Sequence, residues 1–536
     1  MKLSCWFFGL LVLLLALAAC SSDGGDDLES ASDDDNDDAG LDDDDGGGDD
    51  DDNDDNDDDT PAPGDSSPSF NYGIVHYHYY GDLGGYDGQI FLDDQKWAAA
   101  NVELGIIGNT DDGSRMAWSE IRANQPRGWW LVWQTAHLFN TREAEGDCAN
   151  PQPGDADQAF AERQAEFAAF LDDYPAYGDG ENCFLHARRD GRIQARWHAL
   201  GCDIILNQAG EEGSAPDRKG ARIETMVWDE YAWLFDLGSD CARDFHIWKV
   251  GRQITDDGFS GGGFDNLGSP LADGYYLPVQ IDDIDIEEIP DDVEADAEKL
   301  DDWYYDTVTD FLTAVGAGLR EIHADAVLVF NGATYCSWDG YTEQLAAMVS
   351  AGVGIWCESG LQYPSWGAID TPDRIEALAD LSGRLAEKDS FLVLETAYDG
   401  GQSDPSPEEV LYYLAALYAL KSDGDFLSLV PDWSPYSPLK DVLWFPVFER
   451  DLGQPTGPAE AFGDGIFTRP YRRSDGLETL VLVRVDGDNA AVSYSLDGDY
   501  CRVGADDALT PLTGDITVES GDGLILLVNG TGDAGC

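Results

Sequence analysis

Two carboxylic acids stand directly after short apolar runs, and their spacing makes them the strongest candidates for chemistry. Asp265 ends a glycine-rich run, and Glu358 follows the apolar stretch 353–357. Hydrolysis of a glycosidic bond requires two carboxyl groups: one protonates the leaving oxygen, and the other attacks the sugar or activates water. Carboxyls about 5–5.5 Å apart give retention of configuration, and carboxyls about 6.5–9.5 Å apart give inversion. The pair predicts a carbohydrate-cleaving site in a fold that brings the two residues together.

The surroundings of the two acids indicate different roles. Glu358 follows Trp356 and Cys357, and an apolar setting favours the protonated form that a general acid needs. Asp265 precedes Asn266 in a more polar setting, which suits a nucleophile or an electrostatic stabiliser. The glycines before Asp265 permit a ligand to approach the backbone closely. The alternative is that each acid only forms an ion pair at the end of a strand.

Further residues are candidates for contacts with a sugar. These predicted substrate-binding residues are His76, His78, Trp133, Asn266, Asn331, Glu395 and Trp433. The two histidines alternate with tyrosines in one run, so both fit hydrogen bonding to hydroxyls; a metal site lacks a third ligand nearby. Glu395 is the reserve catalytic acid. The two tryptophans fit stacking on sugar rings, and core packing is the equally valid alternative for each.

Elements that position these residues recur along the chain. Eight short apolar runs, each followed by polar or aromatic residues, alternate with longer helix-like stretches. The runs are 73–77, 102–107, 129–133, 262–265, 326–330, 353–356, 391–394 and 426–430. Eight such units predict a closed parallel (β/α)8 TIM barrel, whose strand carboxyl ends carry the site. An open doubly wound sheet is the rival fold, but no glycine-rich phosphate loop supports it.

Three helices and two insertions complete the barrel pattern. The expected helices are 302–322, 222–235 and 407–420, the last with Ser406 as its N-cap. The insertions 140–261 and 269–300 are expected to wall a cleft. Within the first, 183–188 and 192–197 are expected to pair as a hairpin through Asp190-Gly191, and 203–207 is expected to be a short strand.

The chain divides into four regions. They are a signal peptide over 1–19, an acidic disordered linker over 20–66, the barrel over 67–452 and a C-terminal β-sandwich over 453–536. The last is an antiparallel domain whose expected strands are 467–471, 477–485, 490–496, 516–518 and 524–528.

The N-terminus indicates export and a lipid anchor. An apolar stretch of signal-peptide length ends in Leu17-Ala18-Ala19-Cys20, which resembles a bacterial lipobox, in which the cysteine is lipidated. An ordinary signal peptide is the alternative. Residues 21–65 hold 23 acidic side chains and no Lys or Arg, so they should form an extended tether. We expect a membrane-anchored protein of the cell envelope, either periplasmic or on the cell surface.

Charge and cysteine content narrow the partners. A formal net charge of −77 excludes nucleic acid and disfavours polyanions, which leaves neutral or cationic sugars. Eight cysteines remain after Cys5 and Cys20, and an even number in an exported chain predicts disulfides, with Cys501 paired to Cys536. The sequence contains no CxxC pair, so we expect neither a zinc site nor thiol redox chemistry. We therefore expect an oligo- or polysaccharide partner, a monomer, and neither a cofactor nor a metal.

Short motifs resemble a known group of enzymes. The stretches Phe264-Asp265-Asn266, Phe330-Asn331-Gly332 and Ile355-Trp356-Cys357-Glu358 resemble the endings of strands four, five and six in bacterial glycosyl-hydrolase-like (β/α)8 barrels. The resemblance extends, more distantly, to glycoside hydrolases of the endo-α-1,4-polygalactosaminidase type. The stretch that begins at Phe467 is similar to the sandwich that ends many such enzymes. The resemblance implies an O-glycosyl hydrolase.

Two other functions stay open on the same barrel. One is a catalytically inactive carbohydrate-binding lipoprotein. The other is a metal-dependent hydrolase or deacetylase, which would need His76 and His78 beside a carboxylate.

Overall fold

The computed structural model describes most of the chain after residue 70. The described residues are 71–74, 88–108, 112–147, 150–153, 158–186, 193–197, 202–206, 222–227, 230–265, 286–294, 296–331, 336, 349–361, 371–396, 405–429, 443–485, 490–532 and 535–536. The predicted signal peptide, Cys20 and the acidic linker lie outside them. Among the described helices, none has both the length and the apolar character that a bilayer crossing requires.

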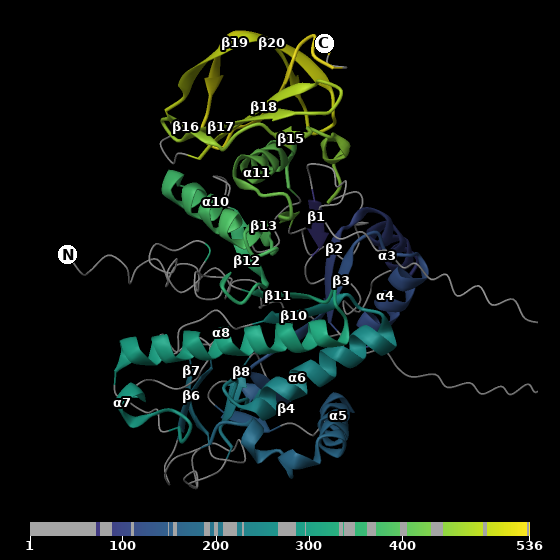
Figure 1. Cartoon of the computed structure of the whole chain (residues 1–536), viewed down its shortest axis with the longest axis vertical. Coiled ribbons are helices and arrows are strands. Elements are labelled where there is room, and N and C mark those ends of the chain that lie inside the picture. Colours follow the sequence, from purple (N-terminus) through teal and green to yellow (C-terminus); the bar gives the residue numbers. More distant parts are fainter. Residues whose placement is uncertain are drawn as a thin grey trace, which may run out of the picture. The chain divides into compact units, whose positions relative to one another are not determined.

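Eight parallel strands form a closed barrel in the order β1-β14-β13-β12-β11-β10-β3-β2, with β1 and β2 paired to complete the circle (Figure 1). The strands are β1 (Asn71–Ile74), β2 (Leu104–Gly108), β3 (Trp129–Thr135), β10 (Gly261–Asp265), β11 (Val327–Asn331), β12 (Gly354–Leu361), β13 (Leu392–Thr396) and β14 (Phe426–Ser428). Each coincides with one of the eight predicted runs, shifted by a few residues at most. The predicted TIM barrel is confirmed.

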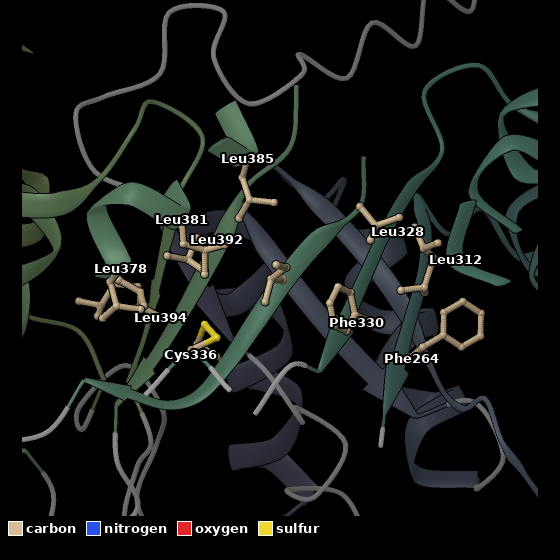
Figure 2. Packing of buried hydrophobic residues seen from close by; sticks show 14 of the residues in the cluster. Phe264, Leu312, Leu328, Phe330, Cys336, Leu378, Leu381, Leu385, Leu392 and Leu394 are labelled. Carbon is tan, nitrogen blue, oxygen red and sulfur yellow. A yellow bond between two sulfur atoms is a disulfide. The ribbon is translucent and has the colours of Figure 1, made fainter. Parts of the chain in front are cut away.

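Alternation along the strands separates an inner from an outer layer. Leu131, Val329, Trp356 and Val393 belong to one cluster inside the barrel, and all are buried. Their neighbours point outward: Figure 2 shows Phe264, Leu328 and Phe330 beside Leu312 of a covering helix, and Leu392 and Leu394 beside Leu378 and Leu381 of another. Gly261 is required for close strand packing, because a Cβ there would lie 1.7 Å from the Val327 carbonyl oxygen.

The described α-helices are α3 (Gly88–Asn101), α4 (Asp112–Ala123), α5 (Gln158–Asp173), α6 (Asp240–Arg252), α7 (Asp291–Glu294), α8 (Ala297–Ile322), α10 (Pro372–Ala386) and α11 (Pro407–Leu420). Most of them cover the outside of the barrel, but α5 packs on α6 and on β4 (Leu138–Asp147), and α7 packs on α8. Two of the three predicted helices are confirmed, with α8 starting five residues earlier than expected. The start of α11 is fixed by a capping box, in which Ser406 and Glu409 each satisfy the other's backbone N–H.

The long insertion between β3 and β10 corrects two expectations. Residues 222–235 are not a helix: they contain β8 (Glu224–Val227) and β9 (Glu230–Leu234), which pair antiparallel. The alternation of Tyr231, Trp233 and Phe235 with smaller residues fits the period of a strand, and this signal outweighed the helical one. The second correction is the hairpin, because β6 (Ile193–Trp197) pairs with β7 (Cys202–Leu206), and Phe184 and His186 of the expected partner bridge to Phe235 and Arg222 instead.

Other parts of this insertion are β4 (Leu138–Asp147) and β5 (Asn150–Pro153), which extend the small sheet to the order β5-β4-β9-β8. The strand expected over 203–207 is confirmed as β7. Cys183 lies in the short helix η2 (Glu181–Cys183) and forms a disulfide with Cys241 at the start of α6. This bond ties the insertion to the barrel.

A single curled antiparallel sheet forms the C-terminal region. Its strands are β15 (Gln454–Pro455), β16 (Glu460–Gly463), β17 (Ile466–Arg472), β18 (Glu478–Arg484), β19 (Val492–Val503), β20 (Leu509–Val518) and β21 (Gly523–Val528). All five predicted strands are present. The order is β15-β17-β18-β21-β19-β20, with β16 paired to β17. The predicted Cys501–Cys536 disulfide is confirmed.

The central strands β17, β18 and β21 are largely buried on both faces, whereas β16 and much of β19 and β20 are exposed. On one face, Leu482, Ile516 and Leu526 form a core of their own, enclosed by the curl of the sheet. The other face packs on α11 of the barrel, where the hydroxyl of Tyr471 donates to the Tyr418 carbonyl at 2.6 Å. Gly523 allows the closest approach, since a Cβ there would lie 2.2 Å from the Leu411 carbonyl oxygen.

Candidate active site

Three polar side chains replace the apolar interior at the carboxyl ends of the barrel strands. Asp265, Asn331 and Glu395 lie near the ends of β10, β11 and β13. Val329 and Val393, two residues before the latter pair, belong to the interior cluster. Because residues two apart in a strand share a face, the polar residues occupy the inner face at the mouth of the barrel. This is the end at which barrels of this type bind substrates.

Asp265 and Asn331 are brought together by neighbouring strands. The Asn331 side-chain amide donates a hydrogen bond to Asp265 Oδ1 at 3.0 Å. Asn331 is buried, with 5% of its surface exposed, whereas Asp265 is half-buried. An ionised carboxylate is only an acceptor, so an amide donor fixes its orientation while one side faces the mouth. The barrel thus brings one predicted catalytic acid into contact with one predicted substrate-binding residue, and the roles of both stay predictions.

Glu395 has a partner that the sequence did not indicate. The indole N–H of Trp356 donates to Glu395 Oε2. Trp356 is fully buried, and its ring meets the edge of the Trp133 ring at a centroid distance of 5.0 Å. Trp133 is therefore a half-buried wall of the barrel interior below the mouth. A signal was present in the sequence, because Trp356 is a large aromatic residue on the inner face of the strand beside Glu395.

Glu358 lies in β12, two residues after the inward-facing Trp356. Its side chain is outside the described part of the structure, so the separation of the two predicted catalytic carboxyls stays a prediction. The residue before Glu358, Cys357 of the same strand, forms a disulfide with Cys336. Cys336 lies in the connection after β11, so the bond ties β12 to that connection. The pairing of β12 with β13 shifts register between Cys357 and Leu361, which is an irregularity typical of strand ends near functional sites.

Four predicted substrate-binding residues lie outside the described residues: His76, His78, Asn266 and Trp433. Their roles stay predictions. Within the described residues, no group of three or more His, Cys, Asp or Glu side chains is arranged to hold a metal ion.

Two buried histidines at the β3 end of the barrel are neutral. Burial lowers the pKa of His137 to about 4 and that of His246 to about 3. The Nε2 atom of His246 lies 2.9 Å from the Ala136 carbonyl oxygen, where a protonated nitrogen donates. The His246 ring packs against the rings of Phe235 and Phe311.

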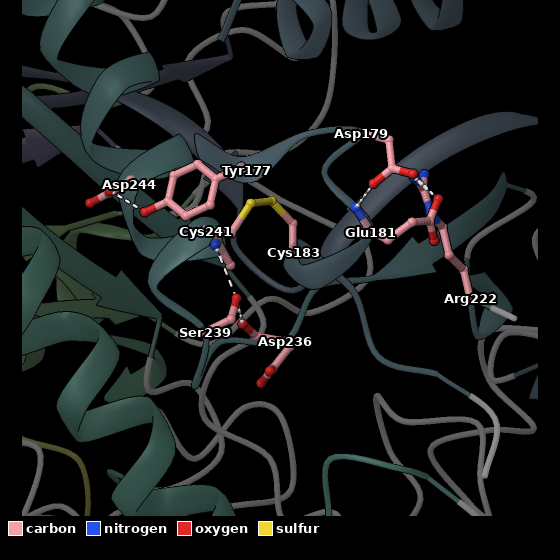
Figure 3. The surroundings of a disulfide bond; sticks show 10 residues. Tyr177, Asp179, Glu181, Cys183, Arg222, Asp236, Ser239, Cys241 and Asp244 are labelled. Atoms are coloured by element: carbon pink, nitrogen blue, oxygen red, sulfur yellow. Dashed lines mark hydrogen bonds and ion pairs between the residues drawn. A yellow bond between two sulfur atoms is a disulfide. The ribbon is translucent and has the colours of Figure 1, made fainter. Parts of the chain in front are cut away.

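Charged residues of the connections after β3 and β10 form two contacts that the sequence did not predict, one within the first connection and one between the two. Arg222 forms a bidentate ion pair with Glu181, with a shortest contact of 2.6 Å (Figure 3). Its guanidinium lies 4.2 Å from the Phe184 ring centroid and 4.4 Å from that of Trp233. His186 contacts Glu288 at 2.7 Å. Both contacts depend on segments far apart in the chain, which no local pattern reveals.

One hollow of about 970 Å³ lies away from this mouth. It is bounded by α4, α5 and α6 and includes Trp118, Lys249 and Phe259. Phe259 precedes β10, whereas Asp265 ends it, so the hollow lies toward the opposite end of the strand. Lys249 is already paired with Glu166 at 3.1 Å. The convergent polar residues at the strand carboxyl ends favour the mouth, rather than this hollow, as the reactive site.

No protein-family model and no curated protein matches this sequence. Solved structures do match. Amy13B of Eubacterium rectale is 13% identical, with a TM-score of 0.45 over 86% of this chain and 97% of that chain. A GH27 β-L-arabinopyranosidase of Geobacillus stearothermophilus is 9% identical, with a TM-score of 0.46 over 88% and 98%. The α-galactosidase I of Mortierella vinacea is 10% identical, with a TM-score of 0.41 over 88% and 98%.

These likenesses concern the fold. The closed eight-stranded barrel that the sequence predicts is shown by the strand order of the chain itself. At such low identities and scores, the likeness adds nothing about the substrate or the catalytic residues of this chain.

Proposed function

We propose that this chain is an exported, lipid-anchored glycoside hydrolase that cleaves O-glycosidic bonds of a polysaccharide, with Asp265 and Glu358 as its catalytic carboxylates. The observation that supports this most is the hydrogen-bonded Asp265–Asn331 pair at the mouth of a closed barrel. Glu358 belongs to β12, which is separated from β10 by β11 alone.

Strand spacing makes the pair of acids feasible. Backbones two strands apart are about 9–10 Å from each other, since neighbouring strands are about 4.8 Å apart. Side chains that converge from two such strands toward the barrel axis reach the separations of about 5–9.5 Å that glycosidases use. Both positions stand two residues after a residue of the interior layer, Gly263 in β10 and Trp356 in β12.

The chemistry follows from the two settings. Asp265, oriented by an amide donor, acts as the ionised group that attacks the anomeric carbon or takes a proton from water. Glu358 donates its proton to the glycosidic oxygen as the carbon–oxygen bond breaks, and the leaving sugar departs as an alcohol. Glu395, held by Trp356, offers its other oxygen to a sugar hydroxyl. None of these steps requires a cofactor.

The substrate class follows from charge, and the location from the N-terminus. A net charge of −77 repels polyanions and favours a neutral or cationic polysaccharide. Lipidation at Cys20 and the acidic residues after it would hold the barrel away from a membrane of the cell envelope. The proposed protein works as a monomer.

A screen of neutral and amino-sugar polysaccharides with the full chain, Asp265→Asn and Glu358→Gln tests the proposal. We expect each substitution to lower kcat by about a thousandfold or more, the scale seen when a catalytic group is removed. The matched control is Glu376→Gln, because Glu376 is an exposed acid on α10. Full activity in both variants would contradict the mechanism. Binding without hydrolysis by the unaltered chain would favour a sugar-binding protein. Loss of activity after addition of a chelator would favour a metal-dependent hydrolase.

A further inference from the structure

The Glu288 carboxylate contacts two different atoms of His186. Its ring Nδ1 lies 2.7 Å from Glu288 Oε1, and its backbone N–H donates to Glu288 Oε2 at 2.9 Å. The two residues are 102 positions apart in the sequence. His186 belongs to the insertion after β3, and Glu288 belongs to the connection that leads from β10 to α8. A single carboxylate thus joins the two connections.

The contact is well ordered by its surroundings. The Glu287 backbone N–H donates to the His186 carbonyl at 2.8 Å, so the two segments also share a main-chain hydrogen bond. Ile286 and Ile289, on either side, are buried in the main core with at most 1% exposed. The His186 and Glu288 side chains are 14% and 22% exposed. The apolar anchors hold the segment in place, and the polar contact sets its local register against the insertion.

Other charged groups face the imidazole from every described element around it. Glu181 of η2 lies 3.4 Å from His186 Nε2, and Arg222 is bound to the same Glu181 carboxylate. Asp236, before α6, interacts at longer range with both His186 and Glu288, and Arg243 of α6 interacts with Asp236. The hydrogen bond to Glu288 raises the pKa of His186 above its ordinary value, and burial opposes this rise. The protonated ring is therefore the state that satisfies the acids on both sides.

We infer that His186 is a positioning residue whose protonated ring clasps Glu288 and so fixes the connection after Asp265 against the insertion that walls the site. This inference rests on the proposed function for its catalytic consequence. Both connections leave the carboxyl ends of their strands, which is the face that carries the substrate in such barrels. The clasp therefore sets the shape of the outer substrate site without touching the reacting atoms.

Loss of the proton loosens the clasp. A neutral imidazole keeps one N–H for Glu288, but its other nitrogen then presents a lone pair to the Glu181 carboxylate, and the attraction between ring and acids is lost. The folded-state pKa is raised, so the contact is fully formed below pH 6.5 and weakens as the pH rises through the raised value. The buried isoleucines keep the segment attached, so the expected effect is local.

Hydrogen exchange of the full chain tests the clasp without reference to activity. Deuterium exchange at the imidazole carbon reports the His186 titration, and amide exchange of the 286–290 peptide, corrected for the intrinsic effect of pH, reports the contact. We expect protection of this peptide to fall about threefold to tenfold as His186 deprotonates, which is the scale of one hydrogen bond. His186→Gln should remove the step. The matched control, His323→Gln, alters an exposed histidine at the opposite end of α8 and should retain it.

Hydrolysis supplies the second measurement. His186→Gln should raise KM for a long polysaccharide severalfold, abolish the step in KM that follows the His186 titration above pH 6.5, and leave kcat unchanged. Glu288→Gln should reproduce these changes. Protection that does not change with pH in the unaltered chain overturns the clasp. A pH step in protection with no hydrolysis by any variant supports the clasp and refutes the proposed glycosidase. A fall in kcat alone overturns the positioning role.

Discussion

The two ends of the barrel interior are built from the same strands and differ in composition. At the amino ends, Trp129, Phe391 and Phe426 pack ring against ring, with centroids 5.3–6.3 Å apart. At the carboxyl ends, Asp265, Asn331 and Glu395 occupy the same inner face. One end excludes water and holds the strands together, whereas the other end keeps polar groups in fixed positions. The contrast indicates that stability and chemistry are separable along each strand.

The largest effect on stability is expected at the amino end. Phe391→Ala removes a buried ring from the interior and should lower the free energy of unfolding by about 3–5 kcal/mol. Denaturant unfolding followed by tryptophan fluorescence measures this, and hydrolysis per folded molecule should be unchanged. The matched control is Phe462→Ala, since Phe462 is 63% exposed on β16 and should cost little. A large fall in kcat of folded Phe391→Ala would break the separation.

The reverse result is expected at the carboxyl end. Asn331→Ala removes the amide that orients Asp265 and should lower kcat about tenfold to a hundredfold, while stability falls by about 1 kcal/mol, the value of one hydrogen bond. Steady-state kinetics and unfolding of the same preparation give both numbers. Asn124→Ala is the control, because Asn124 is an exposed asparagine that caps its own helix backbone. Unchanged kcat would remove Asn331 from the site.

Asp236, in the insertion after β3, should make the free energy of unfolding depend on pH. Burial raises the pKa of Asp236 to about 6, and the Gly238 N–H opposes this rise. Because the folded-state value is higher than the ordinary value, this group stabilises the protein most at low pH, and the stabilisation is lost as the pH rises from about 4 to about 6.

Asp236→Asn should remove that dependence and stabilise the protein at pH 7 by about 1–2 kcal/mol. Unfolding at a series of pH values from 4 to 7 measures the difference. Asp292→Asn, at an exposed acid of α7, should leave the pH dependence as it is. Parallel curves for Asp236→Asn and the unaltered chain would show that the Asp236 environment does not bias its titration.

The smallest effect is expected at Trp356, which belongs to the apolar interior and contacts Glu395 at the mouth. Trp356→Phe keeps a ring in the interior layer and deletes the N–H that Glu395 accepts. We expect KM to rise severalfold and the unfolding free energy to fall by about 1 kcal/mol, as for one hydrogen bond. Trp444→Phe is the matched control, because it deletes another indole donor to a carboxylate, Glu449, away from the mouth. Equal effects on KM would deny Glu395 a role in binding.

Local patterns carried most of the fold. The eight strands were predictable because each is a short buried run, and α11 because Ser406 and Pro407 mark its start. The segment 222–235 failed because its aromatic residues satisfy a strand period and a helix period at once, and its partner β4 is remote in sequence. The contact between His186 and Glu288 was not predictable, because it exists only once two distant connections meet. Asp265 and Asn331 were recoverable, because parallel strands bring their ends to one edge.

The disulfide between Cys336 and Cys357 has a consequence for where this protein matures. It lies one residue before Glu358 and joins the end of β12 to the connection after β11. The barrel closes through backbone hydrogen bonds that any compartment allows, but this link forms only under oxidising conditions. A chain held in a reducing compartment would complete its scaffold and lack the covalent tie beside the second acid. Full assembly of the mouth is thereby coupled to an oxidising environment.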